Sequence, residues 1–363
     1  MIYKEYGKTG KKISAISFGG MRFHKEDYLH SLENAVKVVH RASELGINYF
    51  DTAPGYCEDY SEKIFGEAFK SMPNPFYVST KLWRCDAPDA RKVLENSLKT
   101  LQVEKINFYH MWCINSLETY QVFMKKGGGY EMALKAKDEG LIDHIVFSTH
   151  ASGEEIETII KDGFFEGVTL GYNAANFAFR QQGIKAAHAH GLGVMTMNPL
   201  GGGIIPKHPD VFNFLIRDQG DTLPQAALKF LVSHPEITAA LPGMGTIAEV
   251  EENVKTVENF TPYSAQTLTD MAQNINKTLN TLCTGCQYCE GCPVGIDIPK
   301  YMEAYNHKII EKTDKSVVDT IKWHWSISKE PVATCIACGK CETLCTQKLP
   351  IIERLKAISE MAD

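Results

Sequence analysis

Residues 47–71, INYFDTAPGYCEDYSEKIFGEAFKS, contain the unit that decides the predicted fold of this chain. Residues 47–53 form a short apolar run, which is typical of a strand covered on both faces. A Pro-Gly turn follows, and residues 61–71 then carry apolar side chains at helical spacing. The stretch therefore predicts a strand followed by a helix, with the polar side chains of Asp51 and Tyr56 near the end of the strand.

The same unit recurs on both sides of this stretch. Seven further strand-like runs are each followed by a helix-like stretch: 15–19 with 31–46, 76–81 with 89–101, 106–112 with 130–140, 142–150 with 153–163, 167–173 with 181–191, 192–200 with 223–234, and 237–243 with 246–256. Eight such units in about 255 residues predict an α/β fold of the (β/α)8 TIM barrel type. The alternative is an open doubly wound sheet, which normally has a G-x-G-x-x-G motif after its first strand. This sequence has no such motif there.

The alternation stops around residues 259–266, NFTPYSAQ, and the sequence beyond has a helical pattern. We therefore expect a barrel formed by residues 1–262 and a small, mainly helical domain formed by residues 263–363. A length of 363 residues agrees with two units.

The second domain contains two cysteine-rich runs, CTGCQYCEGCPVGIDIP at 283–299 and CIACGKCETLCTQKLP at 335–350. Structural disulfides are disfavoured because a chain of this length, 44% hydrophobic, can bury a large core without them. Zinc often takes two separated C-x2-C pairs. Three thiols at steps of three, followed by a fourth, are instead typical of a ferredoxin-like domain with two [4Fe-4S] clusters. The predicted cluster ligands are Cys283, Cys286, Cys289, Cys292, Cys335, Cys338, Cys341 and Cys345. A single cluster, a zinc site or structural thiols remain the alternatives.

Both runs depart from the usual spacing, which has three residues between the third and fourth cysteines and then a proline. The second run keeps that spacing but has Thr346 in place of the proline. The first run has only two residues between Cys289 and Cys292, although its proline is present. The sequence therefore leaves open which cluster Cys292 and Cys345 bind.

Catalytic residues of a TIM barrel lie at the C-terminal ends of its strands. At three successive strand ends the sequence has Asp51 with Tyr56 just beyond, then Lys81, then His110 followed by Trp112. A phenol beside an ammonium and a carboxylate can deliver a proton, because the cation lowers the pKa of the phenol and the carboxylate orients the cation. We predict Asp51, Tyr56, Lys81 and His110 as catalytic residues. The alternative is a buried Asp–Lys pair beside a core tyrosine.

Four stretches, DTAPGYCEDYSEKIFGEAF, VSTK, FSTH and PGMGTIAEVEEN, resemble the aldo-keto reductase superfamily across residues 1–258. With the cysteine-rich tail, the chain is similar to the branch that has a C-terminal 4Fe-4S ferredoxin-type domain. The resemblance implies NAD(P)H-dependent reduction of a carbonyl, or oxidation of an alcohol, with Tyr56 supplying the proton and Asp51 and Lys81 supporting it. The cofactor-binding positions that it implies are Gly20, Met21, Asp51, Ser148, Thr149, Met197, Pro199, Leu200, Gly243, Met244, Glu249, Glu252 and Asn253.

Four positions differ from the family pattern. Trp112 stands where the family has its catalytic histidine, and His110 lies two residues earlier, so His110 is either catalytic or a core residue. Thr169 replaces a glutamine that holds the carboxamide, and Met197 replaces the ring that stacks on the nicotinamide. Glu249 stands where relatives that use NADPH have an arginine. A carboxylate repels a 2′-phosphate, so this position favours NADH.

The two predicted cofactors handle electrons differently, because a hydride carries two electrons and a cluster passes one at a time. The clusters are therefore predicted either to be structural or to exchange electrons with a ferredoxin or a flavoprotein partner. The main alternative function is an iron–sulfur electron-transfer protein whose barrel has lost hydride chemistry and serves as a binding scaffold. A third is a barrel that acts on a sugar-like substrate without net redox change. The substrate cannot be read from the sequence, and loops at 113–128 and 200–222 are expected to shape its pocket.

Three cysteines lie outside the two runs. Cys57, Cys85 and Cys113 follow three successive strands, so all three are expected near the catalytic rim. They are either ordinary loop thiols or a redox or metal-binding group.

Charge and hydropathy exclude several classes of partner. The net charge is −6 and no Lys/Arg-rich run is present, so we expect no nucleic-acid binding. No apolar window of about 18 residues predicts a membrane span, and the first residues lack the apolar stretch of a signal peptide. We expect a cytoplasmic protein in a reducing environment, as thiols and clusters require.

Overall fold

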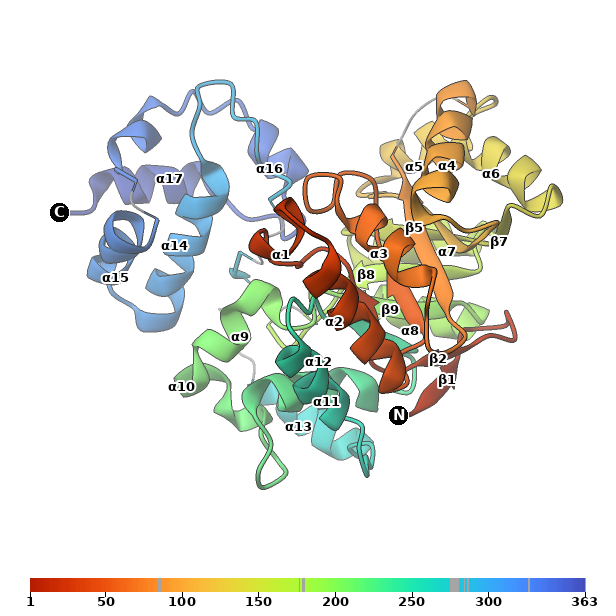
Figure 1. Ribbon diagram of the computed structural model, residues 1–363. Helices are drawn as coiled ribbons and strands as arrows, with labels where there is room; N and C mark the ends of the chain where they lie inside the picture. Colours follow the sequence, from red (N-terminus) through yellow and green to blue (C-terminus); the bar gives the residue numbers. More distant parts are fainter. Residues whose placement is uncertain are drawn as a thin grey trace.

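We describe the fold from a computed structural model, shown in Figure 1. The structure describes residues 1–83, 87–175, 177, 180–274, 281–283, 285, 287–325 and 327–362. The predicted rim thiol Cys85 and the predicted cluster ligand Cys286 lie outside the described residues.

Eight parallel strands form the sheet predicted from the sequence. In spatial order they are β3 (Phe18–Gly19), β4 (Tyr49–Asp51), β5 (Tyr77–Leu82), β6 (Ile106–Met111), β7 (Ile142–Thr149), β8 (Gly167–Gly171), β9 (Gly193–Met197) and β10 (Ala239–Leu241). The first and last strands meet through parallel bridges of Ile16 with Ala240 and of Gly19 with Gly243. The sheet thus closes into a nearly complete barrel, which confirms the predicted (β/α)8 fold.

Helices cover the outside of the barrel in chain order (Figure 1). The eight that follow the strands are α2 (Glu33–Glu44), α3 (Ser61–Phe69), α4 (Ala87–Leu101), α6 (Gly129–Asp138), α7 (Gly153–Lys161), α8 (Gln181–His190), α11 (Leu223–Ser233) and α12 (Ile247–Lys255). Three of them begin with a capping box, at Ser152, Thr222 and Thr246. In each box the hydroxyl accepts a backbone N–H three residues later, so these helix starts are encoded locally.

An antiparallel hairpin of β1 (Tyr3–Glu5) and β2 (Lys12–Ser14) precedes the barrel. The hairpin and its loop contribute Tyr6 and Ile13 to an inner core with Tyr49, Phe108 and Met195. The Tyr6 ring lies 4.5 Å from that of Phe108, centroid to centroid. The barrel interior is therefore packed with side chains at this depth, which leaves the opposite, carboxyl end for chemistry.

Both predicted long loops contain short helices. The loop after β6 includes α5 (Leu117–Met124), which is capped by Ser116. The loop after β9 includes η2 (Gly201–Gly203), α9 (Ile204–Lys207), α10 (Pro209–Phe212) and η3 (Asn213–Leu215), and α1 (Glu26–Leu29) follows β3. These helices are too short for hydrophobic periodicity to reveal them in the sequence.

The tail is helical, as predicted, and forms a lobe beside the barrel (Figure 1). Its elements are α13 (Ala265–Asn274), α14 (Ile298–Glu311), α15 (Asp314–Asp319), η5 (Thr320–His324), η6 (Glu330–Thr334), α16 (Lys340–Leu344) and α17 (Ile351–Glu360). Leu268 and Met271 of α13 pack in the same core as the barrel helices. Elements α14 to α17 surround a separate core that includes Met302 and Leu355. A domain boundary near residue 262 remains a prediction.

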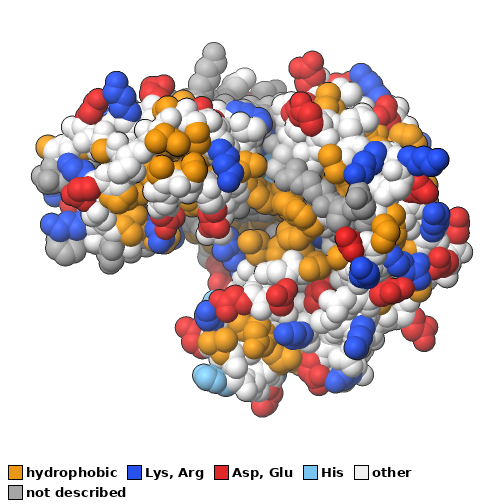
Figure 2. Space-filling model, turned by 90° about the horizontal axis from the view of Figure 1, so that it is seen from above, with side chains coloured by type: hydrophobic (Ala, Val, Ile, Leu, Met, Phe, Trp, Pro, Cys, Tyr) orange, Lys and Arg blue, Asp and Glu red, His pale blue; other side chains and the backbone are white. Residues whose placement is uncertain are grey.

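The surface has no single dominant charge. Acidic and basic side chains are interspersed over the face drawn in Figure 2. Within the described part of the chain, every helix is too short or too polar to cross a bilayer.

Candidate functional site

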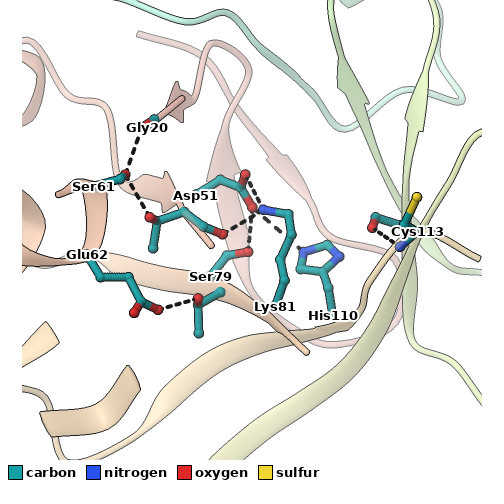
Figure 3. A network of polar contacts seen from close by, with 11 residues as sticks. Gly20, Asp51, Ser61, Glu62, Ser79, Lys81, His110 and Cys113 are labelled. Carbon is teal, nitrogen blue, oxygen red and sulfur yellow. Dashed lines mark hydrogen bonds and ion pairs between the residues drawn. The ribbon is translucent and has the colours of Figure 1, made fainter. Parts of the chain in front are cut away.

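A buried ion pair lies at the carboxyl end of the barrel. Asp51 ends β4 and Lys81 is the fifth residue of β5, so adjacent parallel strands bring the two side chains together. The Lys81 Nζ donates to Asp51 Oδ2 at 2.6 Å and to the Thr52 carbonyl at 2.7 Å. The two side chains are only 2% and 9% exposed. Figure 3 shows them pointing toward one another.

Neighbouring hydroxyls hold this pair in place. Ser79, in register with Asp51, donates to Asp51 Oδ1 at 2.8 Å. Thr52 Oγ1 and Ser61 Oγ are 2.7 Å apart, and Ser61 donates to the Gly20 carbonyl at 2.7 Å (Figure 3). Ser79 was not among the residues predicted from the sequence, although it shares a strand face with Lys81 in VSTK and that spacing was a usable signal.

Tyr56 lies just beyond the pair, in the turn after β4. The Lys81 Nζ is 5.0 Å from the centroid of the Tyr56 ring. Burial, and secondly the Asp51 carboxylate, raise the pKa of the Tyr56 phenol well above its usual value. This differs from the lowered pKa that we expected, because burial is the largest effect on the phenol and the Lys81 ammonium donates to Asp51 and Thr52. Burial also lowers the pKa of Lys81, although Asp51 opposes this.

His110 and Trp112 occupy different environments. His110 pairs with Lys81 across β5 and β6 and is completely buried, with its Nε2 3.9 Å from Asp51 Oδ1. Neither ring nitrogen has a hydrogen-bond partner among the described residues, and burial and the Lys81 charge lower the pKa of His110 well below its usual value. The Trp112 ring instead packs edge-on against Tyr56 at 5.7 Å. Trp112 is therefore the ring beside the phenol, and His110 lies deeper.

The predicted cofactor-binding residues are brought to the carboxyl ends of several strands. Ser148 and Thr149 end β7, where the Ser148 hydroxyl accepts from the Cys113 N–H at 3.0 Å and Thr149 donates to the Ile114 carbonyl at 2.6 Å. Met197 ends β9. The other strand-end positions follow directly: Gly20 and Met21 after β3, Pro199 and Leu200 after β9, and Gly243 and Met244 after β10.

The remaining predicted positions lie on α12. Asn253 is buried there, and the Glu252 carbonyl accepts from Gln225 Nε2 at 3.1 Å. Glu249 is the third residue of the capping box: its Oε2 accepts from the N–H groups of Gly245 at 2.7 Å and Thr246 at 3.1 Å. A negative charge therefore stands at the start of α12, where the helix dipole favours it.

The cysteine runs surround two cavities in the tail. The outer cavity is lined by Cys292 of the first run together with Cys335, Cys338 and Cys341 of the second. The barrel-side cavity is lined by Cys283 of the first run and Cys345 of the second. Cys289 borders both cavities. Each cavity thus receives thiols from both runs. Cys292, the fourth cysteine of the first run, lies with the cysteines of the second run, and Cys345, the fourth cysteine of the second run, lies with Cys283 and Cys289 of the first.

One backbone amide tests whether a cluster fits the barrel-side cavity. The Leu349 N–H already points at Cys345 Sγ, at 3.4 Å, as amides around iron–sulfur clusters do. Among the described residues, no three His, Cys, Asp or Glu side chains converge closely enough to hold a single metal ion. Thiols that surround a space fit a cluster better than they fit one zinc ion.

The two described rim thiols lie where the sequence placed them. Cys57 has a left-handed backbone, φ 52°, and its Sγ lies 3.6 Å from the Gly20 carbonyl. Cys113 is buried, with φ 64°. A redox or metal-binding role for them remains a prediction.

Arg180 is a residue that sequence reasoning missed. Its side chain is completely buried after β8 and donates to the carbonyls of Ala151, Gly171 and His150 at 3.1, 2.9 and 2.8 Å. It also donates to the Thr346 carbonyl at 2.7 Å, next to Cys345. The barrel rim is thereby joined to the barrel-side cavity. No local pattern announces such a residue, because its four acceptors come from distant parts of the chain.

Comparisons with known proteins agree with this geometry. Residues 15–274 match the aldo/keto reductase family, and residues 282–350 match a 4Fe-4S dicluster domain, which implies two clusters. L-galactose dehydrogenase of Arabidopsis thaliana is 27% identical over 280 residues, covering 69% of this chain and 86% of that protein. L-glyceraldehyde 3-phosphate reductase of Escherichia coli is 22% identical over 330 residues, covering 76% and 92%.

Solved structures show the same fold. An aldo-keto reductase of Bacillus halodurans, AKR11C1 in its holo form, superposes with a TM-score of 0.64 at 20% identity, covering 76% of this chain and 97% of that one. An aldo/keto reductase of Klebsiella pneumoniae, in complex with NADP and acetate, has a TM-score of 0.60 at 20% identity, covering 74% and 93%.

Proposed function

This chain belongs to the aldo/keto reductase family, and we propose that it reduces a small carbonyl compound with NADH, using Asp51, Tyr56 and Lys81. The observation that carries the proposal is the buried Lys81–Asp51 pair, with its ammonium 5.0 Å from the Tyr56 ring, at the carboxyl end of the barrel. A nicotinamide supplies hydride to the carbonyl carbon when it is bound.

Tyr56 is the proposed proton donor to the carbonyl oxygen. A phenol is protonated at neutral pH, as an acid must be before the reaction. Asp51 holds Lys81 in place at 2.6 Å, and the ammonium would stabilise the negative charge that develops on the substrate oxygen. His110 is proposed to support this group from below, since its Nε2 is 3.9 Å from Asp51 Oδ1.

The cofactor would be held by residues of the carboxyl rim. The proposed set is Gly20, Met21, Asp51, Ser148, Thr149, Met197, Pro199, Leu200, Gly243, Met244, Glu249, Glu252 and Asn253. The preference for NADH rests on the Glu249 carboxylate at the start of α12. A 2′-phosphate would face this charge, whereas a 2′-hydroxyl could donate to it.

For the clusters we propose a crossed set of ligands. Cys292, Cys335, Cys338 and Cys341 would bind the outer cluster, and Cys283, Cys286, Cys289 and Cys345 the barrel-side cluster. The cysteines that line only one cavity support this division, namely Cys292, Cys335, Cys338 and Cys341 on one side and Cys283 and Cys345 on the other. Cys286 and Cys289 are assigned by their spacing in the first run. It is also the arrangement in which the fourth cysteine of each run serves the other cluster.

We further propose that the clusters relay electrons. Ile336, which lines the outer cavity, is 61% exposed, and Cys338 is exposed too. A ferredoxin or a flavoprotein could therefore approach the outer cluster closely. A purely structural role would not require this exposure.

A polyhydroxylated carbonyl compound is the proposed substrate class. The names of two relatives refer to L-galactose and to L-glyceraldehyde 3-phosphate. The rings of Trp83 and Trp112 pack edge-on at 5.1 Å, and Trp112 packs against Tyr56. Such rings offer apolar faces on which a sugar-like substrate could pack beside the proton donor.

The test is Tyr56→Phe in the iron-replete protein under anaerobic conditions. Carbonyl reduction, followed as NADH oxidation with sugar aldehydes, should fall by about 10²–10⁴. NADH binding, followed by quenching of tryptophan fluorescence, should stay nearly unchanged. Full activity in Tyr56→Phe would contradict the assignment of the proton donor. Absence of NADH binding to the wild-type protein would instead favour an electron-transfer protein with an inactive barrel.

A further inference from the structure

Arg354 is buried on α17, one helical turn after Ile351, which lines the barrel-side cavity. Only 5% of its surface is exposed. Its Nη2 donates to the Thr281 carbonyl at 2.8 Å, and its guanidinium carbon lies 5.0 Å from the Tyr305 ring centroid. Its Nη1 has no hydrogen-bond partner among the described residues. A guanidinium is always charged, so a full positive charge is present here.

The guanidinium is hydrogen-bonded two residues before Cys283, a thiol that lines the barrel-side cavity. Burial lowers the pKa of Arg354, while Tyr305, Cys283, Cys345 and the neighbouring Glu353 act in the opposite direction. Glu353 is exposed to solvent. In the described part of the chain, no carboxylate lies within 4.0 Å of the Arg354 guanidinium. A buried charge is costly unless an opposite charge compensates it, and the half-buried Cys283 and the buried Cys345 would supply such a charge as cluster ligands.

We propose that Arg354 is the buried counter-charge of the cluster in the barrel-side cavity, and that it raises the reduction potential of this cluster above that of the outer one. The inference rests on the proposed cluster ligands. A cluster with four thiolates becomes more negative on reduction, so a fixed cation nearby stabilises the reduced form. The low dielectric around a buried group strengthens this effect.

The outer cavity lacks an equivalent among its described lining residues. Its cation, Lys340, donates from Nζ to the Gly291 carbonyl at 3.1 Å in an exposed hydrogen bond. Solvent and salt screen an exposed charge much more than a buried one. Lys340 should therefore affect its cluster less than Arg354 affects the other.

Such a difference would direct electrons toward the barrel. The barrel-side cavity lies against the barrel rim, because Arg180 donates to the Thr346 carbonyl and the His150 ring packs on Tyr288 at 5.0 Å. His150 follows Ser148 and Thr149 directly in sequence. Electrons that enter at the outer cluster would then collect on the cluster next to the proposed cofactor site.

The test is a redox titration of the iron-replete protein, with each cluster followed by its EPR signal. Arg354→Gln removes the charge but keeps an amide that can reach the Thr281 carbonyl. Arg354→Gln should make reduction of the higher-potential cluster at least tenfold less favourable, which lowers its midpoint potential by about 59 mV for one electron. The midpoint potential of the other cluster should not change. Arg354→Lys, which keeps a charge, should reduce this shift substantially. Lys340→Met should not move the midpoint that Arg354→Gln moves.

Three outcomes would overturn the inference: no shift in Arg354→Gln, equal shifts of both clusters, or the same shift in Arg354→Lys. If Arg354→Gln loses its clusters, Arg354→Lys decides: retained clusters with unchanged midpoints support a role of charge, and lost clusters show a role in packing. Iron analysis distinguishes a failure of this inference from a failure of the proposed cluster ligands. Wild-type protein with about eight irons per chain has both clusters, whereas iron-free protein would contradict the cluster proposal itself.

Discussion

Replacing Lys81 with methionine should destabilise the barrel as well as remove activity. The Lys81 ammonium is 2% exposed and makes two short hydrogen bonds, to Asp51 at 2.6 Å and to the Thr52 carbonyl at 2.7 Å. Methionine fills a similar volume but provides no donor. Asp51, whose side chain is 9% exposed, then keeps only the bond from Ser79 at 2.8 Å among the contacts described.

The expected magnitude follows from this burial. Removing one partner of a buried ion pair costs about 3–5 kcal/mol, because it leaves an uncompensated charge in the interior. For a barrel of this size, that corresponds to an apparent Tm lower by roughly 6–15 °C. Asp51→Asn combined with Lys81→Met removes both charges and should recover about 2–3 kcal/mol of the loss. Activity should stay low in both variants.

The assay is thermal and urea unfolding under anaerobic conditions, followed by tryptophan fluorescence. Trp112 packs against Tyr56 and so reports on this end of the barrel. Lys92→Met is a matched control, because Lys92 forms an exposed pair with Asp89 and its loss should change stability by less than about 1 kcal/mol. Equal stability of Lys81→Met and Lys92→Met, or no recovery in the double variant, would refute the reasoning.

Three further predictions concern single side chains. His110→Ala should lower stability by about 2–4 kcal/mol with little effect on kcat per folded molecule if His110 is a core residue, whereas a loss of kcat like that of Tyr56→Phe would assign it to catalysis. Glu249→Gln keeps the capping box and removes the charge, so the ratio of the Kd values for NADPH and NADH should fall by about fivefold; an unchanged ratio would show that this helix does not face the ribose. Burial lowers the pKa of His234 to about 4, so the unfolded chain binds a proton more readily between about pH 6.5 and 4, and stability falls as pH falls through that window. When the pH is lowered from 7 to 5, the unfolding free energy of His234→Phe should therefore fall by about 2 kcal/mol less than that of the wild type, and the apparent Tm is the measurement. The control is His30→Phe at an exposed position, whose apparent Tm should fall as much as that of the wild type.

The fold was predictable because its signals are local. Each strand of the barrel is a short apolar run, and each main helix has apolar side chains at helical spacing, so neither needs information from elsewhere in the chain. The same holds for the cluster domain, since thiols at steps of three are close in sequence and the fold brings them close in space. Short helices such as α9 and α10 were missed because four residues carry too little periodicity.

The candidate active site was predictable in composition and less so in geometry. Asp51, Lys81 and Tyr56 lie at strand ends, and parallel strands bring their ends to one rim. The direction in which the Lys81 ammonium points was not encoded in that pattern. It depends on the Thr52 carbonyl and the Asp51 carboxylate. Burial, and secondly the Asp51 carboxylate, raise the pKa of Tyr56, and both depend on how distant segments pack around the phenol.

The sequence by itself determined the eight strand-and-helix units, the strand-end polar residues and the two cysteine runs, because each depends on residues that are neighbours along the chain. Only the tertiary structure decided that Cys292 lies with the second run, that Cys345 lies with the first, and that Arg180 joins the barrel to Thr346. It also decided that Arg354 is buried beside Cys283 and Cys345. Most of these arrangements join residues that are tens of residues apart in sequence, and the burial of a charge depends on every segment that packs around it, so local spacing carries no record of them.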